Sequence, residues 1–158
     1  MAMTLRPFHL AIPVDDIDAA RAFYGGVMGF AEGRSDPRWI DFDMGGHQLV
    51  VHLVCPSPTV NRSGGVEGDR GTARSTNPVD SHDVPVPHFG IILTIAEFDA
   101  LAARLVDASI PFIIAPTVRF AGLPGEQRTM FFTDPAGNAI EFKAFADDAM
   151  IFSTQPSA

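Results

Sequence analysis

The sequence predicts an α+β fold made of two tandem βαβββ modules within one domain of 158 residues. Alternating apolar positions and helical spacings give the element order β-α-β-β-β over residues 8–55 and again over 88–145. A histidine lies at the beginning of each module's first strand, His9 and His88. Between the modules, residues 56–87 are rich in Pro, Gly, Ser, Asn and Arg and show no apolar period, so we expect a linker or long loop there.

In the first module, residues 8–14 read as a short strand, and Pro13 near its end predicts an edge position. Asp15 or Asp16 is expected to cap a helix from residue 17 to about residue 27, whose apolar face includes Tyr24. The remaining strands are predicted at 30–34, 38–44 and 48–54.

The second module contains the stretch around which the chain is organised, the hairpin at residues 131–142. Its centre, Asp134-Pro135-Ala136-Gly137-Asn138, has the composition of a tight turn, and its flanks alternate as half-buried strands do. The other elements are expected to be strands at 88–93, 112–114 (between Pro111 and Pro116), 129–133 and 139–144, and a helix at 96–108. The tail at 146–158 carries Met150, Ile151 and Phe152, which fit either an interface or packing on their own chain.

The overall charge excludes some classes of partner. Eleven Lys and Arg against nineteen Asp and Glu give a net charge of −8, which argues against nucleic acid and anionic membranes. Cys55 is the only cysteine, so an internal disulfide and a thiolate-cluster zinc site are excluded, and a reducing compartment is favoured. The first residues lack the apolar run of a signal peptide, and we expect a cytoplasmic protein.

Glu141 is the first candidate for a functional residue. It lies between Ile140 and Phe142 in a predicted strand, so its side chain points to the face opposite theirs. A carboxylate in such a position costs free energy unless a cation, hydrogen-bond donors or water satisfy it. Histidines elsewhere in the chain could share a metal ion with it.

Three stretches give the chain a recognisable resemblance: residues 8–14 (Phe-His-Leu-Ala-Ile-Pro-Val), residues 18–24 (Asp-Ala-Ala-Arg-Ala-Phe-Tyr) and residues 132–141 (Phe-Thr-Asp-Pro-Ala-Gly-Asn-Ala-Ile-Glu). Together with the duplicated element order, they resemble the vicinal oxygen chelate superfamily, which contains glyoxalase I, extradiol dioxygenases and bleomycin-resistance proteins. The resemblance covers residues 8–145 apart from 56–87. It implies that the modules form a curled mixed sheet around a cup-shaped site, often in a homodimer.

The resemblance also implies a set of metal ligands from the first and fourth strands of each module. Carried over by position, they are His9, His52, His88 and Glu141. Imidazole and carboxylate suit Fe²⁺, Mn²⁺, Co²⁺, Ni²⁺ or Zn²⁺. His52 stands where glyoxalase I has a carboxylate or similar group, so it is a ligand, an acid/base group or a residue that only lines the cup. His47 and His82 are expected to be solvated.

Strand alternation and charge suggest residues that contact a substrate. Gln48 shares a face with His52, and Lys143, the only lysine, shares one with Glu141. On 129–133, Met130 and Phe132 line one face and Phe131 the other. Trp39 and Asp41 point the same way on their strand. An arginine can bind a substrate carboxylate through two hydrogen bonds, although a surface position is the simpler interpretation of both candidates. The predicted substrate contacts are Gln48, Arg119, Arg128, Phe132 and Lys143.

The leading hypothesis is a metal-dependent enzyme acting on a small oxygenated substrate, with His52 and Glu141 as catalytic candidates. The histidine-rich ligand set favours a dioxygenase-like site over a glyoxalase-I-like isomerase, which usually has a second carboxylate as its base. The alternative from another class is a metal-free binding protein of the bleomycin-resistance kind, and a third is a scaffold for a partner protein.

Overall fold

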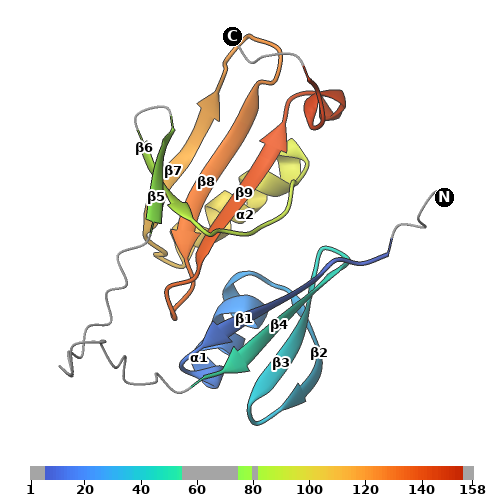
Figure 1. Ribbon diagram of the computed structural model, residues 1–158, viewed down its shortest axis with the longest axis vertical. Helices are drawn as coiled ribbons and strands as arrows, with labels where there is room; N and C mark the ends of the chain where they lie inside the picture. The colour runs from blue at the N-terminus through green and yellow to red at the C-terminus, as the bar shows by residue number, and fades with distance from the viewer. Residues whose placement is uncertain (1–5, 55–74, 80–81, 155–158) are drawn as a thin grey trace, which may run out of the picture.

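A computed structural model describes residues 6–54, 75–79 and 82–154, and the α+β architecture is confirmed (Figure 1). The first module forms a four-stranded sheet in the order β1-β4-β3-β2. Its strands are β1 (His9–Val14), β2 (Ala31–Asp36), β3 (Trp39–Met44) and β4 (His47–Leu53). Pro13 lies in an edge strand, because β1 pairs only with β4, in parallel.

The first helix is also confirmed. α1 (Ile17–Arg21) begins at Asp16, whose carboxylate accepts hydrogen bonds from two backbone N–H groups of the first turn, and it continues directly into a π-helical turn, η1 (Ala22–Val27). Buried Phe23 and Tyr24 face the core from this turn.

The second module repeats the topology of the first. β7 (Phe112–Arg119), β8 (Gln127–Thr133) and β9 (Ala139–Phe145) form an antiparallel sheet, and α2 (Ile95–Asp107) packs on one face of it. Residues 89–93 run beside β9 in parallel, as β1 runs beside β4, but they form two isolated bridges, Phe89–Ile140 and Ile92–Lys143, in place of the predicted continuous strand. Gly90 between the bridges weakens regular pairing. A short helix, η2 (Asp148–Met150), follows β9, and Phe152 beyond it is exposed.

Two sequence predictions about loops are wrong. Residues 75–79 and 82–86, expected to lack regular structure, pair as the strands β5 (Ser75–Val79) and β6 (His82–Val86) of a hairpin. Polar residues and prolines hide the period there, and both strands tolerate proline because each has a free edge. β7 also runs past Pro116, since it is an edge strand and a register shift between Ile114 and Thr117 accommodates the proline. Of the predicted linker, residues 56–74 and 80–81 lie outside the described residues, as does Cys55.

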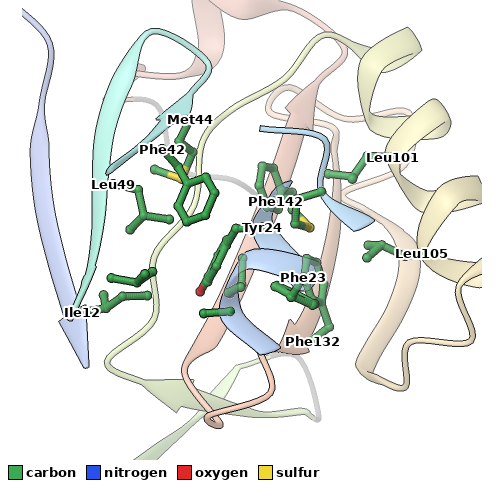
Figure 2. Close-up of a cluster of buried hydrophobic side chains, with 14 of the residues drawn as sticks. Ile12, Phe23, Tyr24, Phe42, Met44, Leu49, Leu101, Leu105, Phe132 and Phe142 are labelled. Atoms are coloured by element: carbon green, nitrogen blue, oxygen red, sulfur yellow. The ribbon is translucent and has the colours of Figure 1, made fainter. Parts of the chain in front are cut away.

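One core joins the two modules. The helix-covered faces of both sheets contribute to a single buried cluster, and Figure 2 shows Tyr24 between Phe42 and Leu49 of the first module and Phe132 and Phe142 of the second. None of the helices in the described ranges has the length and apolar character needed to cross a bilayer.

A buried polar network fixes this contact. The Tyr24 hydroxyl donates to Asp134 Oδ2 at 2.8 Å. Asn138 donates its backbone N–H and its side-chain amide to the same carboxylate, and the amide also donates to the Pro13 carbonyl at the end of β1. The turn at 134–138 therefore hydrogen-bonds with both η1 and β1 of the other module.

We expect Tyr24→Phe to lower the free energy of unfolding by about 1–3 kcal/mol, because it removes one of the donors to the buried Asp134 carboxylate, whose remaining donors come from Asn138. Burial, and then the Asp134 charge, raise the pKa of Tyr24 far above its ordinary value. The folded state therefore holds the phenol proton more tightly than the unfolded state, and stability should fall as the pH rises above about 10.

Urea unfolding between neutral pH and pH about 11 tests this expectation, and Tyr24→Phe should show a weaker alkaline loss of stability. Since Tyr24 is the only tyrosine, tyrosinate absorbance should appear only as the protein unfolds. Tyrosinate formation in the folded protein near pH 10 would show that the hydroxyl is not buried as described.

Gly90 allows residues 89–93 to lie against β9. A Cβ atom at this position would lie 1.6 Å from the Glu141 carbonyl oxygen. We expect Gly90→Ala to cost more than about 2 kcal/mol of stability, because backbone must move away from backbone. Gly26→Ala is the matched control, since nothing lies within 4 Å of its added Cβ, and it should change stability by at most about 1 kcal/mol. Equal thermal stability of the two variants would contradict the close approach.

Candidate metal and substrate site

The second module gathers a polar cluster on the sheet face opposite its core. His88 Nε2 lies 3.1 Å from Glu141 Oε2, and the Thr129 hydroxyl donates to Glu141 Oε1 at 2.7 Å. Lys143 Nζ lies 3.4 Å from the same Oε1. Glu141 is only 7 % exposed, so these groups supply the partners that its burial requires. Two of the four predicted ligands, His88 and Glu141, are thus brought together.

Strand register explains this arrangement. Glu141 pairs with Phe131 of β8, and Lys143, two residues further along β9, pairs with Thr129. These four side chains share one face of the sheet because alternate residues of a strand point the same way. On the other side of β9, the Glu141 N–H donates to the Phe89 carbonyl at 2.8 Å, which brings the neighbouring His88 alongside the carboxylate. The His88 ring also packs edge-on against Phe131, with 5.1 Å between ring centres.

The hydrogen bonds of His88 indicate what it can hold. Nδ1 lies 2.7 Å from the Pro85 carbonyl, which can only accept, so Nδ1 carries a proton. Nε2 of a neutral ring would then be a second acceptor facing the Glu141 carboxylate. That contact is favourable only with a proton on Nε2 or with a cation shared between Nε2 and Oε2. A backbone carbonyl on Nδ1 is also the usual way to orient a metal-binding imidazole, so this pair fits a metal ion.

The first module carries the other two predicted ligands on the open face of its sheet. His9 Nδ1 lies 2.8 Å from Gln48 Oε1, so Gln48 orients this ring and leaves Nε2 available. His52 is exposed and pairs with Pro13 and Trp39, four residues along β4 from Gln48. The register therefore sets Gln48 and not His52 opposite His9. In the described parts of the chain, no three His, Cys, Asp or Glu side chains lie close enough together to hold a metal ion.

Phe132 and Arg128 do not lie at the cluster. Phe132 is fully buried in the core, because it pairs with Ile140 on the helix-covered face. The aromatic residue beside Glu141 is Phe131, so the prediction of Phe132 as a substrate contact is wrong by one residue. Arg128 points to the helix-covered face as well, where it forms an ion pair with Asp99 of α2.

Arg119 lies at the far end of its sheet. It pairs with Gln127, which is four residues along β8 from Phe131 or roughly 13 Å, and its guanidinium lies over the Phe120 ring. Lys143 is the predicted substrate contact that does lie at the cluster.

Two residues of the open face of the second module were not predicted to have a role. Thr129 and Phe131 could have been found from alternation, since both share the face of Glu141 once the core face is known. Asp41 shares the open face of the first sheet with Gln48 and His52; it is buried and paired with Arg34 at 3.0 Å. Trp39 points the same way, so the face that Trp39 and Asp41 share is the open one.

Two cavities lie on these faces. One, of about 310 Å³, is lined by His88, residues 89–92, Glu141 and Lys143. The other, of about 510 Å³, lies over the first sheet, beside Arg34, Asp41 and Gln48. Each open face therefore has space for a small molecule next to predicted site residues.

Comparison with known proteins gives a consistent assignment. The family model described as Glyoxalase/Bleomycin resistance protein/Dioxygenase superfamily matches residues 6–142. A crystal structure of a glyoxalase/bleomycin resistance protein/dioxygenase from Alicyclobacillus acidocaldarius is 35 % identical over 92 % of this chain and 96 % of its own, with a TM-score of 0.69. Comparison with curated proteins gave no significant match.

More distant structures support the fold alone. A lactoylglutathione lyase from Agrobacterium tumefaciens is 24 % identical, with a TM-score of 0.58 over 87 % of this chain and 91 % of its own. A glyoxalase/dioxygenase from Nostoc punctiforme is 19 % identical, with a TM-score of 0.59 over 93 % and 99 %. With nearly the whole described chain matched by the family model, this protein belongs to the glyoxalase/bleomycin resistance protein/dioxygenase superfamily.

Proposed function

We propose that this chain is a metal-dependent enzyme of the superfamily that acts on a small oxygenated substrate. The observation that carries the proposal is the contact between His88 Nε2 and Glu141 Oε2, at 3.1 Å with Nδ1 already committed to the Pro85 carbonyl. Two electron-pair donors turned toward each other fit a divalent cation of the Fe²⁺, Mn²⁺, Co²⁺, Ni²⁺ or Zn²⁺ group. When bound, such a cation would act as a Lewis acid on two neighbouring substrate oxygens.

The remaining ligands are proposed to be His9 and His52, on the open face of the first module. Within one chain the helix-covered faces of both sheets meet in the core, and no third ligand joins His88 and Glu141 in the described residues. A homodimer that brings the first module of one copy against the second module of another would complete the set. Gel filtration with light scattering tests for the dimer.

Each residue of the cluster has a proposed task. Thr129 holds Glu141 Oε1, which leaves Oε2 directed at the cation position, and the buried setting keeps the carboxylate from being solvated. Pro85 fixes the ring orientation of His88. His52, which is exposed, is placed to be a ligand or to move a proton to or from the substrate.

Metal content tests the central claim. Protein purified without a histidine tag should take up about one equivalent of cation per site, and His88→Ala and Glu141→Gln should each weaken cation affinity by about 100-fold or more. His47→Ala is the control, because His47 accepts from the Phe8 N–H and is not a predicted ligand. Less than about a tenth of an equivalent, not restored by soaking with Fe²⁺, Mn²⁺, Ni²⁺ or Zn²⁺, would contradict the proposal.

The reaction class is proposed to be dioxygenase-like, since imidazoles outnumber carboxylates among the candidate ligands. Oxygen uptake with a panel of catechols should then depend on Fe²⁺ or Mn²⁺ and disappear in His88→Ala. Turnover of the glutathione–methylglyoxal hemithioacetal with Ni²⁺ or Zn²⁺, without oxygen uptake, would instead identify the isomerase. The isomerase is the second candidate, because the superfamily to which the chain belongs includes glyoxalases.

A metal-free binding protein is the alternative from another class, and one observation favours it. Lys143 and a protonated His88 together would satisfy Glu141 with no cation present. The metal measurements above separate this alternative from the enzyme, because in a metal-free binding protein the cluster would take up no cation.

A further inference from the structure

Lys143 lies at the candidate site with its charge directed into the cavity. It is the only lysine of the chain, its side chain is 33 % exposed, and it lines the 310 Å³ cavity together with His88 and Glu141. The cavity's other lining residues, 89–92, are Phe, Gly and two Ile, so among the described residues Glu141 is the only carboxylate that lines it. Ile92 opposite Lys143 is 45 % exposed and forms an apolar wall.

The contact between Lys143 and Glu141 is longer than the hydrogen bond that Thr129 forms with the same carboxylate. Nζ lies 3.4 Å from Oε1, whereas the Thr129 hydroxyl donates to the same oxygen at 2.7 Å. Thr129 is buried and remains in place as the structural partner of this oxygen. Within the described residues, the Lys143 ammonium group forms no other ion pair or hydrogen bond, so the Glu141 carboxylate is its only partner.

A cation on Glu141 would change this balance. One carboxylate would then face a divalent cation and an ammonium group together, leaving an excess of positive charge in a partly buried site. Uncompensated charge in such a site is costly, and an anionic group on the bound molecule would neutralise it. The cation itself is proposed to bind two neighbouring oxygens elsewhere on the same molecule.

We propose that Lys143 binds a carboxylate of the substrate, so the substrate class is a small molecule with two neighbouring oxygens and a separate carboxylate group. This inference rests on the proposed metal-dependent function. Lys143 exchanges its contact with Glu141 for the substrate carboxylate when the cation is present. It is a specificity-determining residue, and Ile92 supplies the apolar surface beside it.

The test compares two probes that differ by one carboxylate, catechol and 3,4-dihydroxybenzoate, on protein loaded with Zn²⁺ to avoid oxygen chemistry. Dissociation constants come from calorimetry, or from the fluorescence of Trp39, the only tryptophan. The loaded protein should bind 3,4-dihydroxybenzoate about tenfold more tightly than catechol. Lys143→Met should reduce that preference to about twofold or less with catechol affinity little changed, and Lys143→Arg should retain most of it.

Two controls make the result specific. Arg38→Met removes one exposed positive charge from elsewhere in the chain and should keep the full preference. Protein without metal should show no preference that depends on Lys143, because the ammonium group stays on Glu141. An equal preference in Lys143→Met, an equal preference without metal, or no preference in the loaded wild type would each overturn the inference.

Metal content is measured on the same samples, so the two proposals fail in different ways. A chain that takes up no cation overturns the proposed function, and with it the exchange at Lys143. A loaded chain whose preference does not depend on Lys143 overturns only the carboxylate inference and leaves the metal-dependent function standing.

Discussion

The structure depends on the hydrogen bond between Tyr24 and Asp134, because it is a buried polar contact within the core that the two modules share. The phenol comes from the π-helical turn of the first module, and the carboxylate comes from the turn between β8 and β9 of the second. Asn138 in the same turn also holds the end of β1. The strands that carry His9 and Glu141 are thereby held at a defined separation. The Asp-Pro-Ala-Gly-Asn sequence thus has a structural task in this chain, between the modules.

Most of the fold could be predicted from the sequence because local signals agreed with the tertiary arrangement. Period-two alternation located β1, β3, β4, β8 and β9, and helical spacing located α1 and α2 to within a few residues. The hairpin β5–β6 could not be predicted, since prolines and polar residues interrupt any regular apolar period in its two strands. Residues 89–93 have the sequence pattern of a strand. That pattern does not determine how many backbone hydrogen bonds they form with β9.

The site was predictable in part for a related reason. Alternation alone separates Phe131 from Phe132 but does not determine which of them faces the core, and the packing of α2 decides that question. The pairing of His88 with Glu141 follows from neighbouring strands in one module, so the residue types and their positions were enough to suggest it. The relation between the ligands of different modules depends on how the modules meet, and no local pattern in one sequence specifies that. Gln48 illustrates the same limit, since its role beside His9 follows from the parallel register of β1 and β4.

The β5–β6 hairpin gives the two halves of this duplicated fold different tolerance to mutation. His88 is oriented by the main-chain carbonyl of Pro85, which every amino acid supplies, whereas His9 is oriented by the side-chain amide of Gln48. A single nucleotide change can remove the amide but not the carbonyl. Natural variation should therefore alter the first half-site more readily than the second, and new specificities in related chains should arise by adjusting the first module while the second is kept.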